Sequence, residues 1–229
     1  MLKYNLHPAS YIFHLPSPIL HCFSLFLQHK KNAASHQRKT ANKNLIDHIM
    51  DYRNIIDKYY PEDNELKRLL IRHSSDVARR ALLIADRNPQ MAFDRTFVEE
   101  AAMLHDIGIF TTDAPGIHCH GKDPYIKHGF NGAELLRADG LPHHARVCER
   151  HTGTGITREA IAAQGLPLPL QDFTPETPEE ILVCYADKFF SKSHPERERT
   201  VEQTARSLEK FGGESVARFM AWARMFGED

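Results

Sequence analysis

The 229-residue sequence lacks the features of several large protein classes. It has no apolar run approaching the roughly 20 residues that a membrane-spanning helix requires. Its four cysteines are far apart and form no CxxC pair, which argues against a zinc ribbon or a disulfide framework and favours a reducing cytoplasm. The formal net charge is only −1, so no global basic field is present to attract nucleic acid. We therefore expect a cytoplasmic protein with no membrane partner and no nucleic-acid partner.

Histidine, by contrast, is abundant, with 15 residues in a chain that has a single tryptophan. Basic residues also gather at the start, where positions 1–49 hold six lysines and arginines against one acid, Asp47. These positions carry a charge of +5, which leaves −6 for the rest of the chain. They show no sustained helical or alternating pattern, so we expect a disordered extension over 1–49 and one domain over 50–229.

Three interpretations of this extension stay open. In the first it is a signal peptide, although its apolar stretch is weak and no clear cleavage site follows. In the second it is a basic tail that binds a partner. In the third, Met50 is the natural start and positions 1–49 are a mis-called extension, because helical patterning begins directly after Met50.

From Asp51 onward the apolar residues recur at helical spacing, and no convincing alternating run of a β-strand is found. A loop is expected over 109–125, where proline and glycine are frequent. The pattern predicts an all-α bundle of about seven helices. Two helices finish the chain, and the others are expected to begin near Asn64, Thr96, His128, Pro142 and Thr177.

Polar side chains occupy inward positions on these helices. His73, for example, lies four residues after Leu69 and four before Val77, on the apolar face. A buried carboxylate without a partner costs several kcal/mol, and a shared metal would satisfy all the inward polar groups at once. The alternative is that each histidine is a satisfied core residue and that Asp187 pairs with a lysine or arginine. The six inward residues are His73, His105, Asp106, His128, His151 and Asp187.

The segment 101–108, AAMLHDIG, resembles the signature of the HD superfamily of metal-dependent phosphohydrolases. The order His73, His105-Asp106, Asp187 matches the four-ligand pattern of that family. Segments 128–133 (HGFNGA), 151–153 (HTG) and 186–188 (ADK) resemble motifs of a six-ligand, two-metal subgroup that includes small bacterial dinucleoside-tetraphosphate hydrolases. The resemblance extends over roughly 59–191.

The resemblance implies an all-α fold and two divalent transition-metal ions (Fe, Mn, Zn, Co or Ni). One ion would be held by His73, His105, Asp106 and Asp187, and the other by His128 and His151, with Asp106 bridging both. The implied reaction is hydrolysis of a phosphate ester or anhydride of a nucleotide by a metal-bridging hydroxide, with Asp106 as the catalytic residue. Many relatives carry a lysine after the HDIG segment, whereas this chain has Ile109, so the role of that cation is dropped or moved.

Three cations near the expected ligands are candidates for binding a small phosphorylated substrate, namely Lys122, Arg150 and Lys188. The alternative for each is a solvated surface charge. Two other functions stay open, because the same six ligands occur in HD-fold mixed-valent di-iron oxygenases and an HD domain can act as a non-catalytic sensor. A homo-oligomer also stays open, since the apolar stripe of the last helix can dimerise or belong to the core.

Overall fold

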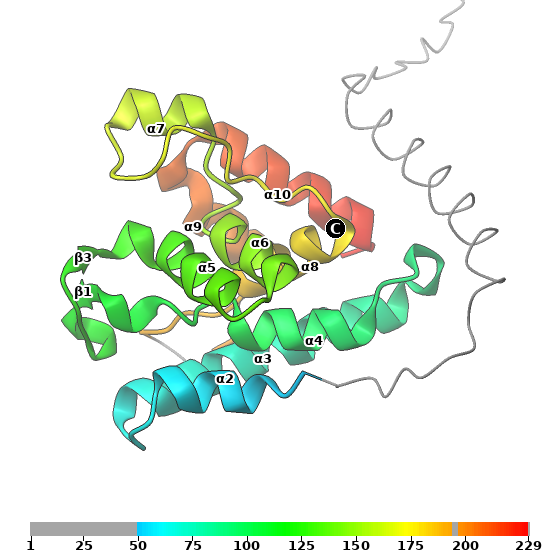
Figure 1. Cartoon of the computed structure of the whole chain (residues 1–229). Helices are drawn as coiled ribbons and strands as arrows, with labels where there is room; N and C mark the ends of the chain where they lie inside the picture. The colour runs from blue at the N-terminus through cyan, green and yellow to red at the C-terminus, as the bar shows by residue number, and fades with distance from the viewer. Residues whose placement is uncertain (1–49, 194–196, 229) are drawn as a thin grey trace, which may run out of the picture. The chain divides into compact units, whose positions relative to one another are not determined.

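Helices dominate the part of the chain that the computed structural model describes, which comprises residues 50–193 and 197–228. The expected disorder of positions 1–49 and the three interpretations of them lie outside this part. No helix of the described residues is long and apolar enough to cross a membrane. The nine α-helices of this part are α2 (Tyr52–Tyr59), α3 (Glu65–Arg87), α4 (Arg95–Leu104), α5 (His128–Ala138), α6 (Pro142–Arg150), α7 (Arg158–Gln164), α8 (Pro178–Asp187), α9 (Val201–Leu208) and α10 (Gly213–Phe226) (Figure 1).

A small β-sheet shows that the expected all-α fold is wrong. Its strands are β1 (Thr112–Ala114), β2 (Cys119–His120) and β3 (Asp123–Pro124), in the order β2-β1-β3. Strand β1 pairs antiparallel with β2, where Asp113 lies opposite His120, and parallel with β3, where Thr112 lies opposite Asp123. Strands of two or three residues are too short to show the alternating pattern by which strands are recognised.

The number of helices also differs from the expected seven. The two helices that the periodicity did not predict are α2 and α7. They have eight and seven residues, so each is only about two turns long. Single 3-10 turns connect several elements of the described part: η2 (Pro89–Met91), η3 (Ile109–Thr111), η4 (Pro115–Ile117), η5 (Tyr125–Lys127) and η6 (Glu209–Phe211). The segment expected to be a loop thus holds 3-10 turns and the sheet.

Capping side chains fix where the long helices begin. Asn64 caps α3, and Thr177 with Glu180 forms the capping box of α8, so both predicted starts are confirmed. Helix α4 is capped by Asp94 rather than by the predicted Thr96. The Asp94 carboxylate accepts the backbone N–H of the third helical residue, and the helix therefore begins two residues earlier than expected.

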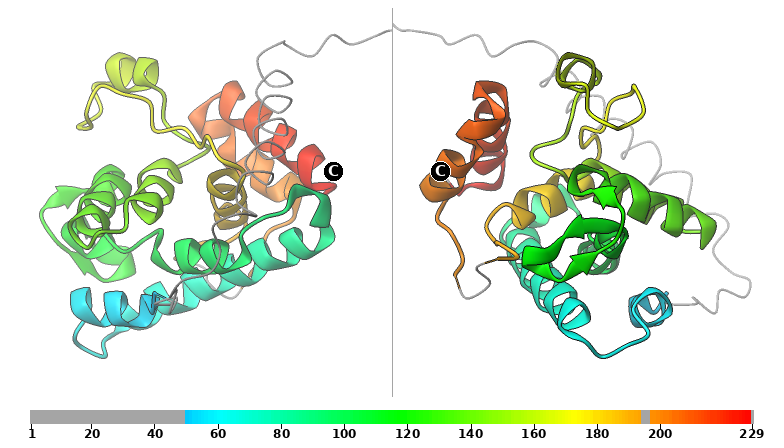
Figure 2. Two further views of the ribbon diagram at one scale, coloured as in Figure 1. Left: turned by 45° about the vertical axis from the view of Figure 1, so that its right-hand side comes forward. Right: turned by 90° about the vertical axis from the view of Figure 1, so that its left-hand side faces the viewer.

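The helices pack so that segments far apart in the sequence meet. Helices α3 and α4 lie side by side and α8 packs against both, while α5 and α6 form a second pair that contacts α4 and α8 (Figures 1 and 2). Fully buried side chains from these helices, including Leu70, Val77, Leu104, Leu136 and Leu182, form one apolar core. This packing brings the ends of α4, α6 and α8 and the start of α5 into one region.

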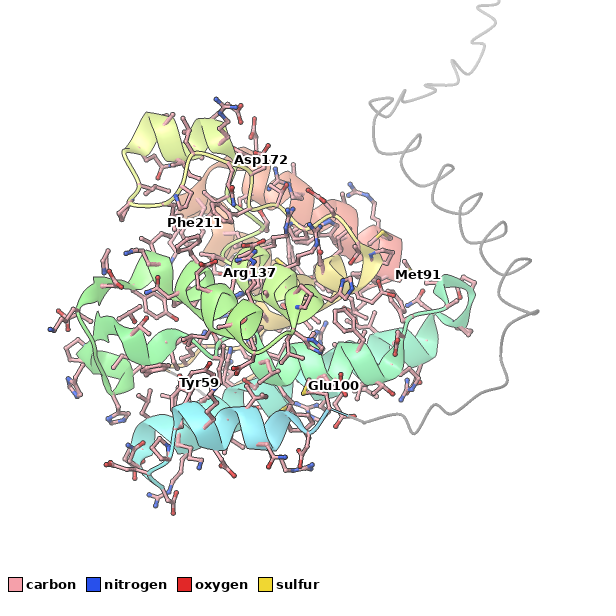
Figure 3. The ribbon with its side chains drawn as sticks, viewed as in Figure 1. Tyr59, Met91, Glu100, Arg137, Asp172 and Phe211 are labelled. Atoms are coloured by element: carbon pink, nitrogen blue, oxygen red, sulfur yellow. The ribbon has the colours of Figure 1, made fainter. Side chains whose placement is uncertain are left out.

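The short helix α2 is tied to the rest of the domain by two tyrosines. Tyr59 lies between α2 and α5 (Figure 3), and its hydroxyl donates a hydrogen bond of 3.0 Å to the carboxylate of Asp139. The buried hydroxyl of Tyr60 donates to the backbone carbonyl of Ile107 at 2.9 Å. Tyr60 therefore supports the turn that follows Asp106.

Candidate metal centre

Four buried side chains from α3, α4 and α8 meet in the core. His73 lies within α3, His105 and Asp106 follow α4 directly, and Asp187 is the last residue of α8. The Nε2 atom of His73 is 3.0 Å from Oδ1 of Asp187 and 3.2 Å from Oδ2 of Asp106. The Nε2 atom of His105 is 3.1 Å from the same Oδ2 atom. One ligand atom from each of the four lies within 4.8 Å of all the others, close enough to share one metal ion.

A second group shares Asp106 with the first. His128 begins α5 and His151 follows α6, and both are buried. Their Nε2 atoms lie 3.5 and 3.3 Å from Oδ1 of Asp106 and 3.1 Å from each other. The structure thus brings together all six residues that the sequence singles out, in two groups that have Asp106 in common.

Backbone carbonyls fix the orientation of three of the histidine rings. The Nδ1 atoms of His105, His128 and His151 lie 2.6, 2.7 and 2.6 Å from the carbonyl oxygen three residues earlier in each case. A carbonyl oxygen can only accept, so Nδ1 carries a proton in each ring. In a neutral ring this leaves Nε2 with a lone pair directed at the cluster, which is the arrangement that metal-binding histidines use.

The second group fits a cation on chemical grounds. Burial and the neighbouring His151 lower the pKa of His128 to about 3, and burial also lowers the pKa of His151, so both rings are neutral near pH 7. Two Nε2 lone pairs and the Oδ1 atom of Asp106 then face one another without a hydrogen between them. Within the described residues, both Asp106 oxygens and Nε2 of His105 are fully buried and lack a well-directed hydrogen bond. A divalent ion would satisfy these atoms.

The first group holds a proton that a metal ion could replace. Burial acts to lower the pKa of His105, but Asp106 and Asp187 outweigh it and raise that pKa to about 9. Burial acts to raise the pKa of Asp106, but Lys192 and His105 hold it well below its usual range. A metal ion bound by these residues would displace the proton on His105, so binding should release protons.

The three predicted phosphate-binding cations take different positions. Lys188 is at the cluster, where its ammonium donates to Asp187 at 2.6 Å and to the carbonyl of His151 at 2.8 Å. Arg150 instead donates to Glu176 at 2.7 Å and to a backbone carbonyl at 2.6 Å. Lys122 is exposed in the turn between β2 and β3. A role for any of them toward a substrate stays a prediction.

One cation at the cluster was missed from the sequence. The ammonium of Lys192 is 2.6 Å from Oδ2 of Asp106. Lys192 lies five residues after Asp187, beyond the end of α8, where no periodic pattern points inward. Ile109, at the position where many relatives carry a lysine, is fully buried in the apolar core.

Comparison with known proteins places the cluster inside one matched segment. The family model of the HD domain matches residues 70–191, more than half of the chain. This segment contains both groups of buried histidines and aspartates. No solved structure matches the chain.

Three curated relatives are similar to parts of the chain. A tRNA (cytidine(56)-2'-O)-methyltransferase of Picrophilus torridus is 38% identical over 144 residues, which are 58% of this chain and 38% of that protein. A protein of the same name from Thermoplasma volcanium is 31% identical over 158 residues, which are 69% of this chain and 41% of that protein. An uncharacterised protein of Methanocaldococcus jannaschii is 39% identical over 107 residues, which are 46% of this chain and 56% of that protein. The chain thus spans about two fifths to just over half of these relatives.

These relatives correct two predictions. The predicted enzyme class, a metal-dependent phosphohydrolase, is wrong, because two relatives are named for methyl transfer and none of the three for phosphate hydrolysis. The exclusion of nucleic acid is also wrong, because the same two names specify a tRNA. That exclusion rested on the net charge of the whole chain, whereas contact with nucleic acid depends on local groups of cations.

Proposed function

This chain belongs to the HD domain family, and we propose that its buried cluster is a metal centre that holds two divalent ions and contacts an RNA. Nitrogen and carboxylate ligands together suit Fe, Mn, Zn, Co or Ni. Such ions, when bound, attract the oxygen atoms of an anionic ligand and orient that ligand. The first ion would be held by His73, His105, Asp106 and Asp187, and the second by Asp106, His128 and His151.

Asp106 provides the main support for this proposal, because its two oxygens face different histidines. Oδ2 lies near His73 and His105, and Oδ1 lies near His128 and His151. A carboxylate that is shared in this way can link two ions and keep them close together. Since it is fully buried, Asp106 cannot exchange these partners for bulk water.

The residues around the cluster hold the ligands in place. The carbonyl contacts of His105, His128 and His151 keep the rings from turning, and Lys188 holds Asp187 against the backbone of His151. Ligands that are already oriented need little reorganisation when a charged group binds. The centre is therefore organised by the chain itself.

The relatives support RNA as the partner. Two of them are named for tRNA, and this chain matches only 38% and 41% of their lengths, so methyl transfer can belong to the part that it does not match. Residues 50–229 carry a charge of −6, so contact with RNA requires local cations. Leu69, which lies one helical turn before His73, is part of a hollow of about 230 Å³ on α3. Its other lining residues are Glu65, Arg68, Arg72 and His118, and the Arg68 guanidinium also pairs with the carboxylates of Asp63 and Glu65. This hollow is the described surface that we propose for the RNA.

The test is a comparison of the full chain with its Asp106→Asn variant. Both proteins are loaded with Mn²⁺, their bound metal is counted, and the tRNA that each protein retains from a tRNA pool is measured by filter binding. We expect Mn²⁺-dependent binding of tRNA by the wild-type chain, and neither bound metal nor bound tRNA with Asp106→Asn. A wild-type chain that binds Mn²⁺ but retains no tRNA would refute the RNA ligand, and one that binds no metal would refute the centre.

We further propose residues 50–229 as the functional unit and the cytoplasm as its compartment. Both groups of the cluster lie within this unit. The described cysteines, Cys119, Cys148 and Cys184, are buried free thiols, as is common in reducing compartments. A chain that begins at Met50 is expected to bind as much Mn²⁺ as the full chain, and a lower amount would contradict this boundary.

A further inference from the structure

Lys192 brings a positive charge to the cluster from outside the segment that the family model matches. That match ends at residue 191. The Lys192 side chain is only 13% exposed, and its Nζ atom lies 2.6 Å from Oδ2 of Asp106. Asp106 is the residue that the two proposed ions would share. A molecule bound to these ions would therefore lie beside the Lys192 ammonium.

The surroundings of Lys192 leave part of its ammonium available. Oδ2 of Asp106 lies on one side, and the phenol of Tyr125 also interacts with the ammonium. The Tyr125 ring stacks on the ring of His128, with 4.5 Å between ring centroids, so it belongs to the wall of the second group. An ammonium has three N–H donors, so even a hydrogen bond to each of these two neighbours would leave one donor for a ligand.

Lys188 differs from Lys192 in this respect. Its ammonium makes two short hydrogen bonds within the chain, to Asp187 and to the backbone carbonyl of His151. These bonds join the end of α8 to the end of α6, which is a structural role. Lys192 has no such backbone partner among the described residues and is anchored only through side chains of the centre.

We propose that Lys192 binds a non-bridging oxygen of an RNA phosphate at the metal centre. The contact with Asp106 holds the ammonium beside the ions, so that a phosphate oxygen could contact both a metal ion and Lys192. This inference rests on the proposed function, because it requires metal ions in the cluster. It assigns the ligand class as a phosphate diester and names the residue that recognises its charge.

The test uses the full chain loaded with Mn²⁺ and inorganic phosphate as the probe. Binding of Mn²⁺ and then of phosphate is measured by calorimetry for the wild type, Lys192→Met, Lys192→Gln and Lys192→Arg. A matched control is Lys210→Met, which removes one charge from an exposed position. We expect both neutral variants to keep their Mn²⁺ and to bind phosphate about 10- to 100-fold more weakly, as for a lost charge-assisted hydrogen bond. Lys192→Arg and Lys210→Met should stay close to the wild type.

The outcomes separate this inference from the proposed function. Full phosphate affinity in a neutral variant that keeps its Mn²⁺ would overturn the inference alone. Loss of Mn²⁺ from both neutral variants, with thermal unfolding that shows a folded protein, would also overturn it, because Lys192 would then act only by supporting Asp106. A wild-type chain that binds no Mn²⁺ would overturn both the proposed function and the inference.

Discussion

Gly108 packs directly against Gly132, so closely that a β-carbon on Gly108 would lie 2.4 Å from the backbone nitrogen of Gly132. The same β-carbon would lie 2.4 Å from the carbonyl oxygen of His128. The turn that carries Asp106 and the start of α5 therefore touch through their backbones. This contact lets His128 come within 3.5 Å of Asp106.

A side chain at Gly108 should separate the two groups of the cluster. The neighbours of its missing β-carbon are backbone atoms, which cannot move aside as a flexible side chain can. We expect Gly108→Ala to lower the free energy of unfolding by about 1–3 kcal/mol, as overpacking does, and to lose the second ion. Urea unfolding and Mn²⁺ counting check this.

The control for this substitution is Gly116→Ala, since a β-carbon there would meet nothing within 4 Å. It should keep the stability and the metal content of the wild type. A Gly108→Ala protein that is as stable as Gly116→Ala and binds two ions would show that the backbone contact is not needed.

The number of bound ions should depend on which group loses a ligand. We expect His151→Ala to keep one of the two ions, because only the second group uses that ring, and His73→Ala to keep the other. Asp106→Asn should lose both, since its oxygens face both groups. Elemental analysis of each purified protein gives the count. Equal loss of metal in all three variants would mean a single ion, not two.

The inward positions of the cluster histidines and of Asp187 could be predicted because helical periodicity places a side chain on the inner or outer face. His73 shows this best, since it follows Leu69 and precedes Val77 on a stripe that the structure buries. Asp106 was indicated instead by its adjacency to His105 and by the resemblance to the HD superfamily. The short strands could not be predicted from periodicity. The strands of the sheet span two or three residues, and no periodicity can be recognised over such lengths.

Contacts between segments that are far apart in the sequence could not be predicted either. Lys192 reaches Asp106, which lies 86 positions earlier in the chain, only because the chain turns back after α8. Arg150 is next to a cluster histidine in the sequence, yet its guanidinium pairs with Glu176, 26 positions later. Adjacency in sequence indicated Arg150 and Lys188 but not Lys192, because the direction of a side chain depends on partners that a local pattern does not contain.

Divalent ions should stabilise the fold. A ligand that binds only the folded state at 100 times its Kd adds about 2.7 kcal/mol to the free energy of unfolding. For a domain of this size we expect Mn²⁺ to raise Tm by about 5–10 °C and EDTA to reverse the change. Mg²⁺ should have a smaller effect, because imidazole nitrogens suit transition metals better. Equal shifts with Mg²⁺ and Mn²⁺, or a shift that remains in Asp106→Asn, would contradict binding at the cluster.

His144 should make the protein sensitive to acid independently of the metal. It is buried on α6 against the ring of Phe97, with 4.9 Å between ring centroids, and its Nε2 atom lies 3.2 Å from a carboxylate oxygen of Glu100. Burial, with a smaller contribution from His143, lowers the pKa of His144 to about 4, against 6.5 for an ordinary histidine. Between these two pH values the unfolded chain binds a proton at this position that the folded chain does not. The free energy of unfolding therefore falls as the pH drops from 6.5 toward 4.

Replacement of His144 by glutamine removes this difference in bound protons between the unfolded and the folded chain. We expect the pH dependence of the free energy of unfolding to become shallower in His144→Gln by roughly 1 kcal/mol per pH unit between pH 4.5 and 6. Urea unfolding of both proteins in EDTA measures the two slopes and keeps metal out of the comparison. Between pH 8 and 9 the slopes should agree, because His144 is almost entirely neutral there in both the folded and the unfolded chain. Slopes that also agree between pH 4.5 and 6 would show that the folded protein protonates His144 as readily as the unfolded chain does.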